Sequence, residues 1–353
     1  MTAALRVVSP GLMTTLQDLG RPGYQNLGIP VSGALDPVSL RAANALAGNP
    51  PGSAALEIAY QGPTLAVEAD SVRLAYAGAA AGIEVLSGDE EAGTRRLAPL
   101  QSMRLRRGQV VRIGALNGGA VAYLAVEGGF AVAPVLGSRS TYVRAGIGGI
   151  EGRALKAGDL VPMAQVYAED REEMMLPSLP LTAPSRFRIV LGPQDDYFTP
   201  RGIETLLEAT YTVTPASDRM GMRLDGPALE HAKGFNIVSD GIAPGSIQVP
   251  GNGLPIVLLA DRQTTGGYPK VATVISADLP ALGRLTPGCK VAFTAIGIEA
   301  AEAARRQMMA DLEDLTRQLA PVRHESAIDA ARLMASNLVS GVVNAREGNP
   351  EGA

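Results

Sequence analysis

Four short segments of the chain place arginine among hydroxyl, amide or carboxyl side chains in turns rich in glycine or proline. A planar guanidinium group with fixed donors suits a carboxylate or a phosphate, and glycine lets a ligand approach the backbone closely. Convergence of the four segments would therefore create an anion-binding site. The candidate residues are Gln17, Asp18 and Arg21 in the first segment, Ser138, Arg139, Ser140 and Thr141 in the second, Asp218, Arg219 and Arg223 in the third, and Asp261, Arg262, Gln263, Thr264, Gly266, Gly267 and Tyr268 in the fourth.

A structural alternative applies to each segment. Arginine and aspartate in turns also pair with each other and with backbone carbonyls to hold β loops together, because buried polar groups must be satisfied. Taken singly, each segment favours this alternative. Only the convergence of all four would favour a shared site.

Other catalytic and metal-binding chemistries find little support. Cys289 is the single cysteine and has no evident histidine partner, and the two histidines, His231 and His324, are far apart, so neither a zinc site nor a reactive thiol is expected. The chain lacks G-x-x-x-x-G-K-S/T and G-x-S-x-G, and its glycine-rich residues 146–152 lack the G-x-G-x-x-G spacing. Glu57 interrupts an apolar strand, either as a buried acid or as an outward-facing residue.

Composition narrows the classes of partner. The 353 residues carry a net charge of −4 with scattered lysine and arginine, so we expect no nucleic acid or anionic membrane as partner. Small molecules or proteins are the expected partners. No apolar run approaches the roughly 20 residues that cross a bilayer, and the N-terminal residues lack a signal peptide's apolar core, which predicts a cytoplasmic protein.

The elements that would position these residues are mostly strands. Short apolar runs bounded by turn residues predict a β-rich first half. One helix is predicted there, with Asp36 as N-cap, Pro37 as its first residue and Gly48 at its end. The predicted strands of this half are Leu5–Val8, Leu56–Tyr60, Val72–Ala77, Ile83–Leu86, Val110–Ile113 and Val121–Val126.

A charge run followed by three prolines in residues 168–184 disfavours both helix and strand, which predicts a domain boundary. We predict a β-rich N-terminal domain over residues 1–178, a second β domain over 179–297, and a helical extension with a disordered tail over 298–353. After the boundary the predicted strands are 186–192, 210–214, 247–249, 256–260, 271–276 and 290–296, and the predicted helices are 203–209, 298–319 and 326–339.

Together and in this order, the segments resemble the carboxyltransferase subdomain A and B family, whose members are also described as allophanate hydrolase subunit 2, KipA or the C subunit of 5-oxoprolinase. The resemblance covers about residues 5–296. The matching segments are T-L-Q-D-L-G-R-P-G-Y-Q, G-I-P-V-S-G-A-L-D-P, A-N-A-L-A-G-N-P, A-A-L-E-I, V-L-G-S-R-S-T-Y, S-D-R-M-G-M-R-L-D-G-P, P-G-S-I-Q-V-P-G-N-G-L-P-I-V-L-L-A-D-R-Q-T-T-G-G-Y-P and I-S-A-D-L-P.

The resemblance implies a mainly β protein with two β-barrel-like, cyclophilin-like domains before the C-terminal helical extension. It implies a subunit of a bacterial ATP-dependent 5-oxoprolinase, which converts 5-oxoproline to glutamate and would act only in complex. A KipI-like partner would share in activating 5-oxoproline with ATP. A LamB/YcsF-like partner would complete ring opening.

The residues suit this chemistry. Phosphorylation turns the lactam oxygen into a good leaving group, and this step needs positioning and charge stabilisation more than a protein nucleophile. The arginines would hold the substrate carboxylate and the phosphoryl group, and Asp218 or Asp261 would bind magnesium or orient an arginine. Asp261, Arg262, Gln263, Arg219 and Asp218 are therefore the catalytic candidates, and the other residues of the four segments would bind substrate or anion.

Two alternative functions stay open. A biotin-dependent carboxyltransferase related to urea carboxylase would need its carrier in trans, because the chain has no M-K-M motif. A non-catalytic, KipA-type binding protein could use residues 298–319 as a docking helix. The chain also departs from the family pattern at Asn26, Arg284 and Cys289, where histidine, glutamine and aspartate are common; if the family glutamine touches ligand, Arg284 changes the charge of the site.

Overall fold

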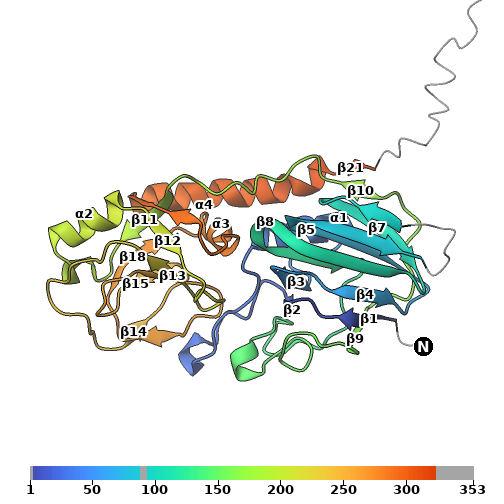
Figure 1. Ribbon diagram of the computed structural model, residues 1–353, viewed down its shortest axis with the longest axis horizontal. Helices are drawn as coiled ribbons and strands as arrows, with labels where there is room; N and C mark the ends of the chain where they lie inside the picture. Colours follow the sequence, from blue (N-terminus) through green and yellow to red (C-terminus); the bar gives the residue numbers. More distant parts are fainter. Residues whose placement is uncertain (1–2, 88–93, 323–353) are drawn as a thin grey trace, which may run out of the picture.

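The computed structural model describes residues 3–87 and 94–322, which form two β-rich halves beside one long helix (Figure 1). The first half contains most of an 11-stranded sheet, and the second contains an eight-stranded sheet and a two-stranded ribbon. The strands of the first half are β1 (Ala4–Ser9), β2 (Met13–Gln17), β3 (Ala55–Ala59), β4 (Thr64–Val67), β5 (Ser71–Leu86), β6 (Thr94–Leu97), β7 (Gln101–Arg106), β8 (Val110–Val126), β9 (Leu160–Pro162) and β10 (Met174–Met175).

The elements of the second half follow in chain order. The ribbon pairs β14 (Asp240–Gly241) with β17 (Thr265–Gly266). The eight-stranded sheet consists of β11 (Phe187–Leu191), β12 (Tyr211–Val213), β13 (Gly221–Asp225), β15 (Ser246–Gln248), β16 (Ile256–Leu258), β18 (Lys270–Val274), β19 (Lys290–Val291) and β20 (Phe293–Ala295). The helices of the chain are α1 (Pro37–Ala47), α2 (Pro200–Glu208), α3 (Leu279–Gly283) and α4 (Ile298–Glu313), with 3-10 turns η1 (Gln25–Leu27), η3 (Val143–Ala145), η4 (Asp195–Tyr197) and η5 (Asp314–Gln318).

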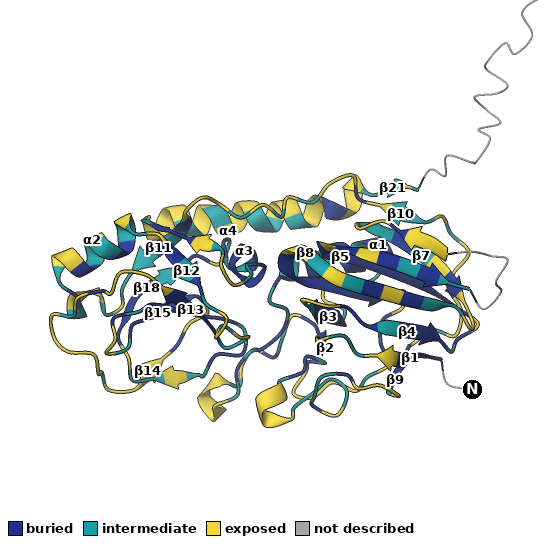
Figure 2. Ribbon diagram, viewed as in Figure 1, coloured by how far each residue is buried: buried dark blue, intermediate teal, exposed yellow. Residues whose placement is uncertain are grey.

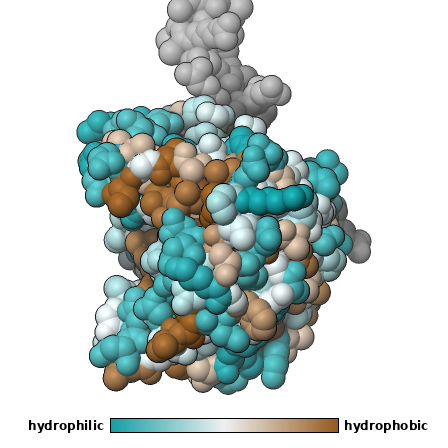
Figure 3. Space-filling view, turned by 90° about the vertical axis from the view of Figure 1, so that its left-hand side faces the viewer, coloured by the Kyte–Doolittle hydropathy of each residue, from teal (hydrophilic) through white to brown (hydrophobic). Residues whose placement is uncertain are grey.

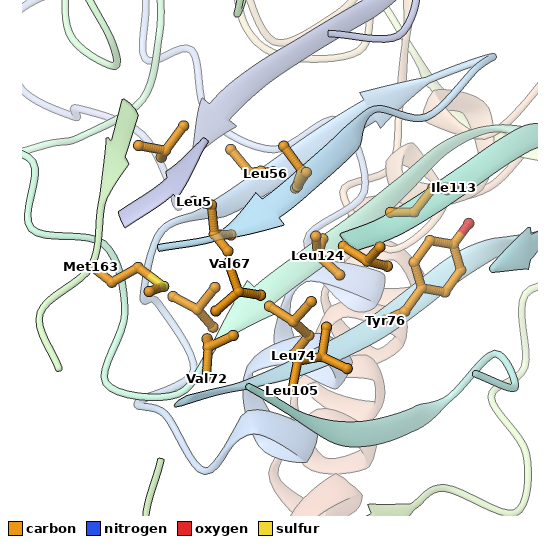
Figure 4. Close-up of a cluster of buried hydrophobic side chains, with 14 of the residues drawn as sticks. Leu5, Leu56, Val67, Val72, Leu74, Tyr76, Leu105, Ile113, Leu124 and Met163 are labelled. Carbon is orange, nitrogen blue, oxygen red and sulfur yellow. The ribbon is translucent and has the colours of Figure 1, made fainter. Parts of the chain in front are cut away.

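Two long strands, β5 and β8, form the centre of the larger sheet. They pair antiparallel from Leu74 opposite Val126 to Leu86 opposite Val110, with irregularities near Gly78. The sequence predicted four short strands here, and that division was wrong, because pairing between the two strands continues through the glycines that separate the apolar runs. Figure 4 shows the core on one face of this sheet, including Leu5, Leu56, Val67, Leu74, Leu124 and Met163.

Helix α1 covers the other face of the larger sheet and confirms the helix predicted there. The Asp36 side chain accepts hydrogen bonds from the amides of Val38 and Ser39, Pro37 is the first helical residue, and Gly48 ends the helix in the left-handed conformation. The buried side chains of Leu40 and Leu46 on this helix belong to a second apolar cluster. The start of the helix is therefore fixed close to the sheet.

The smaller sheet forms a nearly closed barrel. In its strand order the two edges are β19 and β20, which are consecutive in the chain and separated only by Ala292. β19 pairs with β12 and β20 pairs with β11, so the chain itself joins the two edges. This closure confirms the mainly β, barrel-like architecture. The barrel core contains Phe187, Tyr211 and Phe293, all buried.

Helix α4 runs along the top of the molecule from the barrel toward the larger sheet, and its outer surface is exposed (Figures 1 and 2). The predicted helix 298–319 is thus confirmed, with its last turn as η5. After η5, β21 (Ala320–Pro321) pairs with β10, and β10 pairs with β7. The strand β10 contradicts the prediction that residues 168–184 contain no strand. β10 is only two residues long, and such a short strand can pair at a sheet edge between the charge run and the prolines. The helix predicted at 326–339 lies outside the described residues.

Hydrophobic side chains reach the surface at the barrel end, and the largest cluster lies in the upper part of Figure 3. The other hydrophobic side chains there form separate patches among hydrophilic ones. Phe235 and Val238 are exposed hydrophobic residues of this half. Within the described part of the chain, no helix is long and apolar enough to cross a membrane.

Candidate functional site

The first two polar segments meet around Asp18. Its Oδ1 accepts hydrogen bonds from the hydroxyls of Ser138 (2.6 Å) and Ser140 (2.5 Å) and from the amide of Gly20 (2.8 Å). Its Oδ2 accepts one from the amide of Arg139 (2.6 Å). Four donors saturate this buried carboxylate, so Asp18 holds the two loops together, as the structural alternative expects.

Arg21 and Gln17 strengthen the same junction. The Arg21 guanidinium donates to the carbonyl oxygen of Ser140, and Gln17 Nε2 donates to that of Thr141 (3.0 Å). The Arg21 side chain is fully buried, and burial lowers its pKa against the opposing effect of Asp18 and Asp261. The side chain of Arg139 donates to the carbonyl of Val132 (2.6 Å). Gln17 and Arg21 therefore support the loops from inside, whereas the half-buried Arg139 keeps part of its guanidinium group accessible.

The third and fourth segments meet through Arg219 and Asp261. Arg219 Nε lies 2.8 Å from Asp261 Oδ2, and Nη2 lies 3.1 Å from Oδ1, a bidentate pair. Nη1 donates to Glu57, and Nη2 also donates to the carbonyl oxygen of Gly33 (2.6 Å). Burial opposes the charge of Arg219, but the carboxylates of Glu57 and Asp261 outweigh burial and raise its pKa. Arg219 thus joins the barrel to the first half of the chain.

Glu57 is the acidic residue that the four segments did not include. Its Oε2 accepts hydrogen bonds from the amide of Leu35 (2.9 Å) and from the hydroxyl of Tyr123 (2.5 Å). Burial, together with the charges of Glu57 and Asp36, raises the pKa of Tyr123 well above its usual value. In the sequence, Glu57 was noticeable because it interrupts an apolar strand, either as a buried acid or as an outward-facing residue. The structure shows that it is a buried acid.

Ser32 links the two networks and was not among the candidates. Its hydroxyl lies 2.5 Å from Asp261 Oδ1 and 3.4 Å from the carbonyl oxygen of Thr141. Its backbone is left-handed, at φ +57°, which is uncommon for a residue other than glycine. All four segments therefore belong to one hydrogen-bonded region between the two halves. No local pattern in the sequence marks Ser32 for this position.

Arg262 faces the backbone. It is buried, its Nε donates to the carbonyl of Ile242 (3.2 Å) and its Nη1 to that of Leu259 (3.3 Å), and burial lowers its pKa. The carbonyls of Thr264 and Gly267 accept from Ile242 and Ile237, and β17 pairs with β14. Within the described residues, these parts of the fourth segment hold residues 237–242 against the barrel.

A groove of about 680 Å³ in the barrel half is lined by four further candidates, Asp218, Arg223, Gln263 and Tyr268. Gln263 Nε2 donates to Gln248 Oε1 (3.2 Å), and Gln248 Nε2 donates to the carbonyl of Tyr268 (3.4 Å). Gln248 comes from β15, where the sequence indicated only a strand. The polar residues along the groove are Arg144, Thr214, Asp218, Arg223, Asp225, Gln248, Asn252, Gln263 and Tyr268.

Gly266 allows this glutamine pair to form. A Cβ at Gly266 would lie 2.6 Å from Gln248 Nε2, closer than side-chain carbons approach such atoms. A Cβ at the neighbouring Gly267 would meet nothing nearer than 3.5 Å. A Cβ at Gly266 would therefore push the Gln248 amide aside, whereas a Cβ at Gly267 would not.

A second hollow of about 340 Å³ lies between the two halves and shares Asp218 with the groove. Glu57 and Arg219 line it, but most of its other lining residues are apolar, including Leu12, Met13, Met222 and Leu259. Burial raises the pKa of Tyr60 at this hollow. Its surface suits an apolar group better than an anion.

Charge pairing decides which arginines face a ligand. In the buried region, Arg21 and Arg219 lie near three carboxylates, those of Asp18, Asp261 and Glu57. Neither guanidinium therefore carries excess positive charge for an anion. At the groove, by contrast, Arg223 is exposed, and Arg144 lies 3.8 Å from Asp218. Among the residues that the structure describes, no group of three or more His, Cys, Asp or Glu is placed to hold a metal ion.

Comparison with known proteins identifies a family and several similar chains. Residues 27–295 match the family described as carboxyltransferase domain, subdomain A and B. The chain is 36% identical over 315 residues to the C subunit of 5-oxoprolinase from Escherichia coli, covering 89% of this chain and 98% of that protein. It is 37% identical over 305 residues to the protein of the same name in Haemophilus influenzae, covering 86% and 94%.

A solved structure supports the same fold. The urea amidolyase of K. lactis matches with a TM-score of 0.81 and 30% sequence identity over 89% of this chain. The match covers 20% of that much longer protein. The chain therefore corresponds to one part of the amidolyase but to nearly the full length of the bacterial relatives.

Proposed function

The chain belongs to the carboxyltransferase subdomain A and B family, and on that premise we propose that it is the C subunit of an ATP-dependent 5-oxoprolinase, which converts 5-oxoproline to glutamate. Similarity over nearly the full length of two proteins of that name supports this function. The structural observation that carries the proposal is the glutamine pair in the groove, beside the exposed Arg223.

The glutamine pair suits a lactam. Gln263 uses one proton of Nε2 for Gln248, and within the described residues its second proton and its Oε1 have no hydrogen-bond partner. A lactam presents its N–H and C=O on the same side of the ring. Such an edge can donate to Oε1 and accept from Nε2 of one primary amide. Gln263 would thus recognise the ring of 5-oxoproline.

Arg223 and Arg144 would recognise the charged parts of the reactants. Both line the groove, and a guanidinium group binds carboxylate or phosphate oxygens. One of them would hold the substrate carboxylate, and the other the phosphoryl group that ATP transfers to the lactam oxygen. ATP would be bound with magnesium, and Asp218, at the shared wall of groove and hollow, would be the carboxylate that faces the ion.

The buried region would act as support. Arg219 fixes Asp218, its neighbour in the chain, through contacts to both halves. Asp261 and Ser32 hold Arg219 in turn. In this proposal Asp261 and Arg219 are positioning residues, and Gln263, Asp218 and Arg223 contact the ligand. Arg262, which contacts only backbone among the described residues, holds the loop.

The proposal includes partner subunits. We expect a KipI-like and a LamB/YcsF-like protein to complete the enzyme, because the relatives are named as subunits. The test is to purify the chain with both partners and to measure ADP and glutamate formed from 5-oxoproline. Arg223→Ala and Gln263→Ala should each raise KM at least about tenfold, the effect of losing about 1.4 kcal/mol of binding. Arg6→Ala, which removes an exposed arginine paired with Glu68 on the larger sheet, should leave KM unchanged.

A complex with no 5-oxoproline-stimulated turnover would contradict the proposal. The second candidate is a biotin-dependent carboxyltransferase with its carrier in trans, favoured by the structural match to urea amidolyase and by the amide edge of Gln263, which would also fit urea. Urea has no carboxylate. Bicarbonate-dependent transfer to urea from a biotin carrier, insensitive to Arg223→Ala, would establish this candidate instead.

A further inference from the structure

Arg284, at the end of α3, is a buried arginine whose donors are not satisfied. The residue is 9% exposed. Its Nη1 lies 2.9 Å from Asp36 Oδ2, but neither Nη1 nor Nε forms a well-oriented hydrogen bond within the described residues. A guanidinium group carries five N–H donors, and buried donors without acceptors are unfavourable. Asp36 therefore offsets the charge of Arg284, but the guanidinium group has more donors than well-oriented acceptors in the described part of the chain.

A cavity of about 480 Å³ lies beside Arg284, apart from the groove and the hollow described above. It is lined by α3, by residues 179–184 between the two halves, and by the end of α4 with η5, and it is open to solvent on one side. Leu179, Leu312 and Leu315 form part of an apolar wall. The space thus joins a cationic group to a hydrophobic surface.

The acidic residues of the cavity differ in how far they are neutralised. Asp278 forms a bidentate pair with Arg188, at 2.6 and 3.1 Å, and Asp314 lies 2.8 Å from Arg317. Asp311 accepts a hydrogen bond from Gln307 (2.8 Å), and among the described residues it forms no ion pair. One carboxylate therefore lacks a cation in the same cavity where one guanidinium lacks acceptors.

We propose that this cavity binds a zwitterionic amino acid with an apolar side chain. Its carboxylate would accept hydrogen bonds from Nη2 of Arg284, the guanidinium nitrogen that is not among its fully buried atoms. Its ammonium group would lie toward Asp311, and its side chain would pack on the apolar wall. A simple carboxylate anion would be repelled by the carboxylate of Asp311, which is unpaired among the described residues, whereas a zwitterion brings its own ammonium group to that carboxylate. The site does not depend on the function proposed above, because none of the groove residues lines this cavity.

The test is isothermal titration calorimetry of the full chain with leucine. Leucine should bind at one site per chain. N-acetylleucine, which lacks the ammonium group, leucinamide, which lacks the carboxylate, and glutamate, which has a charged side chain, should each bind at least about tenfold more weakly, a loss of about 1.4 kcal/mol. These three compounds separate the contributions of the two poles and of the side chain.

Variants locate the site. Arg284→Gln and Asp311→Asn should each weaken leucine binding at least about tenfold, while Arg306→Gln, on an exposed arginine of α4 that does not line the cavity, should not change it. Asp311 is exposed on α4, so Asp311→Asn should fold even if Arg284→Gln does not. The absence of binding by both leucine and methionine would overturn the proposal, as would unchanged affinity in Asp311→Asn or in a folded Arg284→Gln.

Discussion

Arg219 and Asp261 form a bidentate ion pair, with N–O distances of 2.8 and 3.1 Å, at the junction of the two halves. Glu57 takes a third donor of the same guanidinium from the other half. Removing one member leaves the others buried without a partner, which costs about 3–5 kcal/mol. Arg219→Ala should therefore lower the free energy of unfolding by about that amount in urea denaturation.

The control for Arg219 is its exposed neighbour Arg223. Arg223→Ala should change the free energy of unfolding by less than about 0.5 kcal/mol, because surface substitutions away from buried networks have small effects. If Arg219→Ala is no less stable than Arg223→Ala, the ion-pair network does not join the two halves.

Asp18 should be as important for stability as Arg219, although it contacts no ligand. Asp18→Ala leaves two hydroxyls and two amides without their acceptor and removes a carboxylate that offsets the buried charge of Arg21. We expect a loss of about 3 kcal/mol or more in the free energy of unfolding. Ser138→Ala, which removes one donor, should cost about 1 kcal/mol. Equal losses in the two variants would contradict a central role for Asp18.

Local signals in the sequence predicted α1, α2 and α4 but not the short α3, and they located the longest strands while missing short ones such as β2, β4 and β13. α1 was predicted because its cap, first-turn proline and final glycine all lie close together around one short apolar run. β5 and β8 were divided because glycine interrupts their apolar runs, whereas pairing with a neighbouring strand decides whether a strand continues. The closure of the barrel through Ala292 likewise depends on partners far away in the chain.

The site was predictable only in part. The polar segments were visible from residue types, but their partners were not, because Arg219 meets Glu57 across 162 positions of the chain. Sequence spacing also could not show that Arg262 turns toward backbone carbonyls while Gln263 lines the groove. Gln248 and Ser32 carry no local pattern that separates them from ordinary strand and turn residues. Such residues become visible only when the fold brings them to the others.

Gly266 should be required for ligand binding. In Gly266→Ala the new Cβ would lie 2.6 Å from Gln248 Nε2 and would displace the Gln248 side-chain amide. This displacement would break the hydrogen bond between Gln248 and Gln263. We expect a rise of at least about tenfold in the KM for 5-oxoproline of the assembled enzyme. Gly267→Ala is the matched control, since its Cβ would meet only ordinary contacts. A similar KM in both variants would remove the glutamine pair from the site.

Tyr211 gives a stability prediction with a defined pH dependence. Its hydroxyl is buried and has no hydrogen-bond partner among the described residues, and burial raises its pKa to about 12. Tyr211→Phe removes the unsatisfied hydroxyl and should raise the free energy of unfolding by about 1 kcal/mol at pH 8. Tyr167→Phe, at an exposed tyrosine, is the control and should leave this free energy unchanged at pH 8.

The sign of the pH effect follows from the raised pKa. The folded protein favours neutral Tyr211, so its contribution is fully present below the unfolded pKa of about 10 and is lost as the pH rises from there toward the folded pKa of about 12. Tyr211→Phe has no hydroxyl to ionise, so its free energy of unfolding does not fall in this way as the pH rises. Its advantage over the wild type should therefore grow by up to about 1.4 kcal/mol for each pH unit above 10. Urea denaturation of both proteins at pH 8, 10 and 11 measures this difference, and a constant difference would show that Tyr211 does not titrate as its burial requires.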